Sequence, residues 1–177
     1  AAAAQAAPAL LPRMTLEEKF WQLFMVPGSP ADSGHDYRHG IFGLQIPAAP
    51  TARQDAERID SVQRFFVERT RLGIPIIPFE EAVHGLTRPG ATVFPQAIAL
   101  AASWDTALMG RVAAAIARET RSRGIRQVLS PVVNLATDVR WGRTEETYGE
   151  DPLLASAMAA AYVAPFERLG VITTPKH

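Results

Sequence analysis

Short apolar runs that alternate with helical segments are the feature that most constrains the fold of this 177-residue chain. Glycines at Gly73, Gly124 and Gly170 stand just before the last three runs, where glycine is typical of a helix end. Such strict alternation predicts a parallel sheet with helices packed outside it. The predicted strands are 41–46, 74–79, 127–133 and 171–174.

The helical segments carry recognisable start and stop signals. Thr15 and Glu18 have the spacing of a capping box, and an apolar helical period runs from there to the break at Pro27. Asp105 and Asp151 are plausible N-caps further along the chain. The predicted helices are 15–27, 51–72, 106–123 and 151–170. Residues 1–13 are expected to be a flexible N-terminus, and residues 14–177 to form one domain.

Two closures suit such a sheet: an open doubly wound sheet, or a (β/α)8 barrel. No glycine-rich phosphate loop follows the first predicted strand, so a nucleotide-binding sheet has no support. Polar clusters instead follow the carboxyl ends of strands, where barrel enzymes place their sites. Four strands make only half a barrel, so the chain is expected to be part of a larger enzyme, truncated after the fourth strand.

Composition excludes several classes of function. The chain has no cysteine, which excludes disulfides, thiolate metal sites and a cysteine nucleophile. Its formal net charge of zero argues against nucleic acid or an anionic membrane as a partner. No motif indicates a metal or another cofactor. The alanine-rich start resembles the residue of a cleaved signal peptide and predicts a secreted or periplasmic protein, although a trimmed terminus is the alternative.

Three polar clusters are the candidates for chemistry. Glu80 and Glu81 follow the strand at 74–79, and only one of them can readily face a barrel mouth because neighbours on an extended chain point apart. Arg140 offers a planar fork of donors that suits hydroxyls or a carboxylate. Lys176 and His177 follow the last strand. Together they indicate a pocket for a polyhydroxylated ligand, while solvated charges and surface salt bridges are the simpler interpretation.

Three further residues are expected to support these groups rather than bind the ligand. His84 precedes a glycine and is more often a supporting residue than a base. Trp141 beside a glycine is more often packing than a stacking platform. Arg143 and the acidic pair 145–146 favour a structural ion-pair network.

At these residues the sequence resembles glycoside hydrolase family 3, the β-glucosidase and β-xylosidase family. The similarity extends over nearly the whole chain from residue 14. The matching stretches are 14–19, 73–77, 80–85, 90–96, 140–146, 148–152 and the terminal pair Lys176-His177.

The resemblance implies a (β/α)8-like barrel and an exo-acting enzyme that releases single β-linked sugars from non-reducing ends with retention, without a cofactor. It implies that Glu81, Arg140, Lys176 and His177 bind the sugar at the cleaved bond, the glycone. It also implies that the nucleophile lies on a later strand and the acid/base in a following domain, so no catalytic residue is expected in this chain. The expected partners are an oligosaccharide or aryl β-glycoside and the remainder of the same enzyme.

Two departures and two alternatives accompany this resemblance. The acidic position holds Glu81 where many β-glucosidases have Asp, which resembles family members described as xylosidases. Asp138-Val139 replaces the common Asp-Pro before the arginine. The alternatives are a non-catalytic carbohydrate-binding fragment and the β-N-acetylglucosaminidase branch of the same family.

Overall fold

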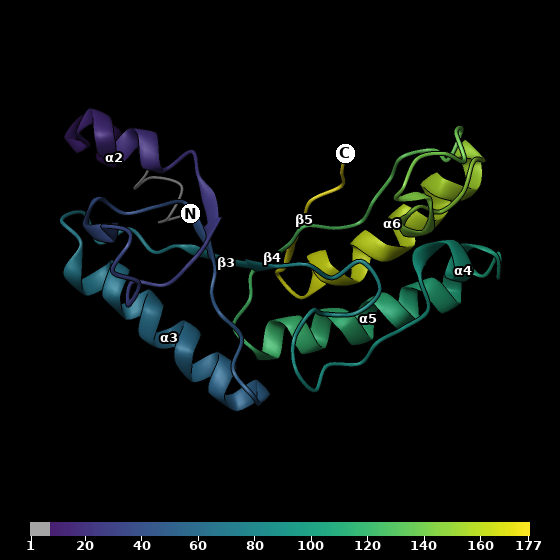
Figure 1. The fold of residues 1–177 in the computed structure, drawn as a ribbon, viewed down its shortest axis with the longest axis horizontal. Helices are drawn as coiled ribbons and strands as arrows, with labels where there is room; N and C mark the ends of the chain where they lie inside the picture. The colour runs from purple at the N-terminus through teal and green to yellow at the C-terminus, as the bar shows by residue number, and fades with distance from the viewer. Residues whose placement is uncertain (1–7) are drawn as a thin grey trace. The chain divides into compact units, whose positions relative to one another are not determined.

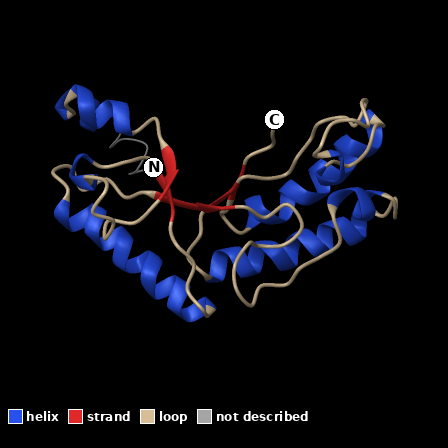
Figure 2. Ribbon diagram, viewed as in Figure 1, coloured by secondary structure: helices blue, strands red, loops and turns tan. Residues whose placement is uncertain are grey.

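The computed structural model describes residues 8–177, which divide into two compact units. The first contains residues up to 47 and residues 57–78, and the second contains residues 48–56 and 79–177. Figure 1 traces the chain from its N-terminus to its C-terminus, and Figure 2 shows how short the strands are beside the loops that join them. Most of the predicted signal-peptide remnant, residues 1–7, lies outside the described residues.

The first unit holds two parallel strand pairings in chain order. Strand β1 (Met25–Pro27) pairs with β2 (Gly43–Gln45), which pairs with the start of β3 (Ile77–Glu80). The helices of this unit are α2 (Leu16–Trp21) and most of α3 (Ala52–Arg69), with short 3-10 turns η1 (Leu11–Arg13) and η2 (Tyr37–His39). The predicted capping box is present, because the Thr15 side chain accepts from the Glu18 amide and the Glu18 carboxylate accepts from the Thr15 amide.

The predicted helix over 15–27 is wrong beyond Trp21. Turn bonds from Leu23 to Phe20 and from Phe24 to Trp21 close the helix, and Met25–Pro27 is a strand. Its register places Met25 opposite Gly43, so hydrogen bonding to a partner strand overrides the local helical period. The described chain therefore has five strands, and the last is the fifth rather than the fourth.

The second unit continues the same pattern. The end of β3 pairs with β4 (Gln127–Val128), and β4 pairs with β5 (Ile172–Thr173), all in parallel. Three helices belong to this unit: α4 (Ala97–Ala101), which the sequence reading missed, α5 (Thr106–Ser122) and α6 (Pro152–Arg168). A 3-10 turn, η3 (Thr144–Glu146), precedes α6.

The core of the second unit lies between α5 and α6, which run side by side in Figure 1. Ile116 of α5 and Met158, Tyr162 and Phe166 of α6 are fully buried. The predicted caps are confirmed, since Asp105 accepts from the Leu108 amide and Asp151 from the Leu154 amide, each at 2.8 Å. Helix starts and packing faces therefore follow the sequence pattern closely in this unit.

Strand order decides between the two closures left open by the sequence. The order is β1–β2–β3 in the first unit and β3–β4–β5 in the second, so each strand pairs with its neighbours in the chain. A doubly wound sheet would reverse this order at a switch point, whereas a (β/α)8 barrel keeps it sequential. The fold is therefore an α/β arrangement of the barrel type. Among residues 8–177, no helix is both long and apolar enough to cross a membrane.

Candidate functional site

The candidate site lies in the second unit, where Glu81 follows β3 and Lys176 follows β5. The ammonium nitrogen Nζ of Lys176 lies 2.9 Å from Oε1 and 3.0 Å from Oε2 of Glu81. Backbone pairing fixes the lysine, because the Val133 amide donates to the Lys176 carbonyl at 2.7 Å. The ends of two strands, β3 and β5, thus bring a carboxylate and an ammonium group into contact.

Glu80 and Glu81 point in different directions, as neighbours on a strand should. The Glu80 side chain is buried and lies 2.8 Å from Nε of Arg88. The Glu81 side chain is 37% exposed and meets Lys176. Glu81 is therefore the member of the pair that is open to a ligand.

His177 is held at both its backbone and its ring. Its amide donates to Oδ1 of Asn134 at 3.0 Å, and its Nε2 lies 2.8 Å from Nη1 of Arg143. Arginine can only donate, so Nε2 accepts and the ring proton sits on Nδ1. Desolvation, with the charges of Arg143 and Lys176, lowers the pKa of His177. The imidazole is therefore neutral near pH 7, with its proton on Nδ1.

Arg143 links this pair to the 3-10 turn η3. Its Nε and Nη2 donate to the two oxygens of Glu146, each at 2.7 Å, in the fork geometry that arginine forms with carboxylates. The bond from Arg143 lowers the pKa of Glu146 and keeps that carboxylate ionised. The predicted ion pair between Arg143 and the acidic pair 145–146 is present at Glu146. It also holds the guanidinium of Arg143 beside His177.

The side chain of Arg140 forms an ion pair with Asp138. Its Nη2 and Nε bind Asp138 at 2.6 and 3.0 Å, and its amide donates to the same carboxylate. The side chain is 86% exposed. The turn that Asp138 closes directs Arg140 outward, and Trp141 donates its amide within the same turn. Three residues later, Arg143 contacts Glu146 and His177.

A cavity of about 400 Å³ opens beside Glu81 and Arg143. It is bordered by polar side chains, which include Glu81, His84, Thr87, Gln96, Arg143 and Glu146. Its volume lies in the usual range for small-molecule sites. Hydrogen-bonding groups of both kinds, donors and acceptors, therefore face a space suited to a small polar ligand.

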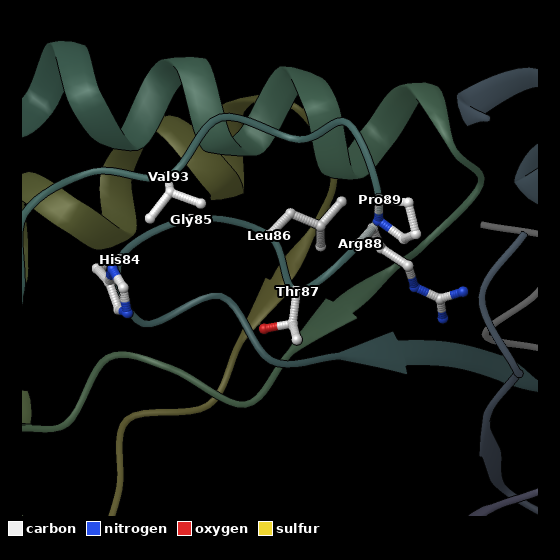
Figure 3. A pocket seen from close by; sticks show the side chains of 7 residues that line it. All are labelled: His84, Gly85, Leu86, Thr87, Arg88, Pro89 and Val93. Atoms are coloured by element: carbon white, nitrogen blue, oxygen red, sulfur yellow. The ribbon is translucent and has the colours of Figure 1, made fainter. Parts of the chain in front are cut away.

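His84, Gly85 and Thr87 also border a second cavity of about 420 Å³, drawn in Figure 3. Leu86, Pro89 and Val93 give this neighbour a more apolar lining. Nδ1 of His84 lies 2.8 Å from the Phe94 carbonyl and donates to it, so Nε2 is left as an acceptor. His84 stands where the two cavities meet. Within the described chain, no group of three or more acidic or histidine side chains could hold a metal ion.

A family model, sequence relatives and a solved structure all relate this chain to β-glycoside-cleaving proteins. The family model described as the glycosyl hydrolase family 3 N terminal domain matches residues 15–177. A β-xylosidase of Formosa agariphila is 38% identical over 135 residues, which cover 68% of this chain and 19% of that protein. A periplasmic β-glucosidase of Salmonella typhimurium is 32% identical over 176 residues, covering 95% and 22%.

Among solved structures, a β-glucosidase from Erythrobacter marinus matches with a TM-score of 0.83 and 36% identity. The match covers 97% of this chain and 25% of that one. This chain thus spans about a fifth to a quarter of the length of these proteins.

Proposed function

The chain belongs to glycoside hydrolase family 3, and from this membership we propose that it is the glycone-binding part of an exo-acting, retaining β-glycosidase. The observation that carries the proposal is the contact of Glu81 with Lys176 beside the polar cavity. An ionised carboxylate accepts hydrogen bonds from sugar hydroxyls, and an ammonium donates to them. The pair is therefore suited to hold one sugar ring by its hydroxyl groups.

The same reasoning assigns Arg143, rather than Arg140, as the arginine of the glycone site. Arg143 borders the cavity and contacts His177, whereas Arg140 is bound to Asp138 and exposed. Hydrogen bonds to the sugar that strengthen in the oxocarbenium-like transition state accelerate cleavage, because only such differential binding raises the rate of the chemical step.

The two carboxyl groups of the reaction are proposed to lie outside this chain. A retaining mechanism needs a nucleophile and an acid/base whose carboxyl groups are roughly 5–5.5 Å apart. The resemblance to the family puts the nucleophile on a later barrel strand and the acid/base in a following domain. The relatives are about four to five times longer than the matched segment, which supports a larger enzyme.

The proposed substrates rest on the names of the relatives and on Glu81, and the proposed cellular location rests on one relative. The matched proteins are named β-xylosidase and β-glucosidase, so β-xylosides and β-glucosides are the proposed substrates. The longer Glu at position 81 favours a pentose, which has no C6 group to crowd. The similarity to a periplasmic β-glucosidase supports an exported enzyme.

The test of this function is Glu81→Gln in the full-length enzyme, assayed with 4-nitrophenyl β-glucoside and β-xyloside. Loss of a charge-assisted hydrogen bond, roughly 1.5–3 kcal/mol, should lower kcat/KM by tenfold or more. Glu150→Gln is the matched control, since Glu150 is exposed and does not border the cavity. Unchanged kcat/KM on both substrates for Glu81→Gln would refute the proposal.

A further inference from the structure

The carboxylate of Glu80 contacts two donors with two different oxygens. Oε1 accepts from the backbone amide of Glu81 at 2.9 Å, and Oε2 lies 2.8 Å from Nε of Arg88. The Glu80 carbonyl also accepts from the Leu129 amide in the ladder between β3 and β4. Both the backbone and the side chain of Glu80 are therefore fixed directly beside the backbone of Glu81.

Arg88 is in turn held by a second buried carboxylate. Its Nη1 lies 3.2 Å from Oδ1 of Asp55, and Nη1 of Arg123 lies 2.8 Å from Oδ2. Asp55 also accepts from the Ala49 amide at 2.7 Å. The four charged side chains are at most 5% exposed. We call Glu80, Arg88, Asp55 and Arg123 the buried charge cluster.

A cluster of this kind is a poor source of stability for its own sake. Removing charges from water costs several kcal/mol per ion, and well-packed apolar residues often replace such groups without loss. What the cluster does provide is a fixed geometry. It fastens both ends of the loop between Glu81 and Arg88, where the Thr87 amide also donates to the Glu81 carbonyl at 3.0 Å.

The loop fastened in this way borders both cavities. Figure 3 shows His84 midway along this loop and Arg88 at its end, with the guanidinium pointing away from His84. Because alternation along β3 turns Glu80 into the cluster, it turns Glu81 toward Lys176. A shift of the Glu81 amide would therefore move the Glu81 carboxylate relative to a bound sugar.

We propose that Glu80 is a positioning residue for glycone recognition, which acts through the Glu81 amide and is itself held by Arg88, Asp55 and Arg123. The inference rests on the proposed function, because it assumes that Glu81 binds the sugar. Glu80 does not touch the substrate. It sets the direction in which its neighbour presents a carboxylate.

The test is a double-mutant cycle in the full-length enzyme with Glu80→Gln, Glu81→Gln and the double variant. Glutamine has one oxygen, so it cannot accept from both the Glu81 amide and Arg88, and its amide group meets a donor. A misplacement of about 1 Å in a site can cost roughly a hundredfold in rate, so Glu80→Gln should lower kcat/KM at least tenfold. In the Glu81→Gln background the same change should cost less than about threefold, because coupled residues are not additive.

The matched control is Glu18→Gln, which also changes a buried glutamate paired with an arginine, Arg71. A purely structural effect lowers the amount of folded enzyme by the same factor in either background, so its costs multiply. Glu18→Gln should behave in this way with Glu81→Gln. If Glu80→Gln does not fold, Glu80→Asp replaces it, since it keeps the charge but is one methylene too short to span both the Glu81 amide and Arg88, and the same non-additive loss is expected.

The outcomes separate the two proposals. Independent, multiplying losses for position 80 and Glu81→Gln would overturn the positioning role while leaving Glu81 as a sugar ligand. Unchanged kcat/KM for Glu80→Gln would overturn it as well. Unchanged kcat/KM for Glu81→Gln itself would instead refute the proposed function on which the inference rests.

Discussion

Glu81 and Lys176 are 95 positions apart in the sequence, yet Nζ of the lysine lies within 3.0 Å of both carboxylate oxygens. The contact exists because β3 and β5 both pair with β4 in parallel, so their carboxyl ends lie at the same edge. The shared neighbour β4 thus brings an acidic and a basic side chain together.

Arg143 and Arg140 provide a matched pair of tests for the glycone site. Arg143→Ala in the full-length enzyme should lower kcat/KM by tenfold or more, because it removes a charged donor of roughly 1.5–3 kcal/mol beside His177. Arg140→Ala removes only an exposed ion pair with Asp138, which is usually worth about 0.2–1 kcal/mol. Steady-state kinetics of both variants check this, and a larger loss for Arg140→Ala would reverse the assignment.

The 177-residue chain alone should not hydrolyse 4-nitrophenyl β-glycosides above background. The nucleophile and the acid/base are proposed to lie outside it. Glycone binding without them cannot form the covalent glycosyl-enzyme intermediate of a retaining mechanism. Release of nitrophenol by the purified chain checks the prediction. Activity that disappears on changing a carboxylate within residues 8–177 would show that the reacting groups are present after all.

Substrate preference should reflect the length of Glu81. A carboxylate one methylene longer than Asp reaches further toward the sugar, and a pentose has no C6 group there. The full-length enzyme should therefore cleave β-xylosides at least as well as β-glucosides. Side-by-side kcat/KM values decide this, and Glu81→Asp should shift the ratio toward glucoside. A glucoside preference above roughly tenfold in the parent, about 1.4 kcal/mol, would contradict it.

Acid should weaken the ion pair between Glu18 and Arg71 in the first unit. The hydrogen bond from Arg71 lowers the pKa of Glu18 from 4.5 to about 2. Since the folded pKa is the lower one, the unfolded chain binds more protons between these values, and this stabilisation is present above pH 4.5 and lost as the pH falls toward 2. Thermal unfolding of the parent and Glu18→Gln at several pH values checks this. The difference in Tm should shrink across that window, and a constant difference would be inconsistent with the shift.

Much of the fold could be predicted because its signals are local. Caps such as Asp105 and Asp151 and the glycines before strands act within a few residues, and the helices they bound lie where expected. Strand β1 escaped prediction because Met25 and Val26 directly follow the apolar positions of a helical period, and only pairing with Gly43–Gln45 reveals it.

The site was predicted less completely, for a related reason. Glu81 and Lys176 follow strand ends, so the sheet alone implies their proximity. The proposed preference for Arg143 over Arg140 rests on the course of one turn, in which Asp138 accepts from the Arg140 amide. The i, i+3 spacing of Arg143 and Glu146 was visible in the sequence, but it does not disclose the further contact with His177.

The opposed directions of Glu80 and Glu81 have a consequence for how this protein can vary. Inserting or deleting one residue in β3 would exchange the two faces, and the carboxylate that neutralises Arg88 would become the one presented to the sugar. A single substitution at position 80 or 81 alters one side chain. A change in the length of β3 would instead disrupt both the buried charge cluster and the cavity beside Glu81. Natural relatives that keep a functioning site should therefore seldom differ in length within 77–81.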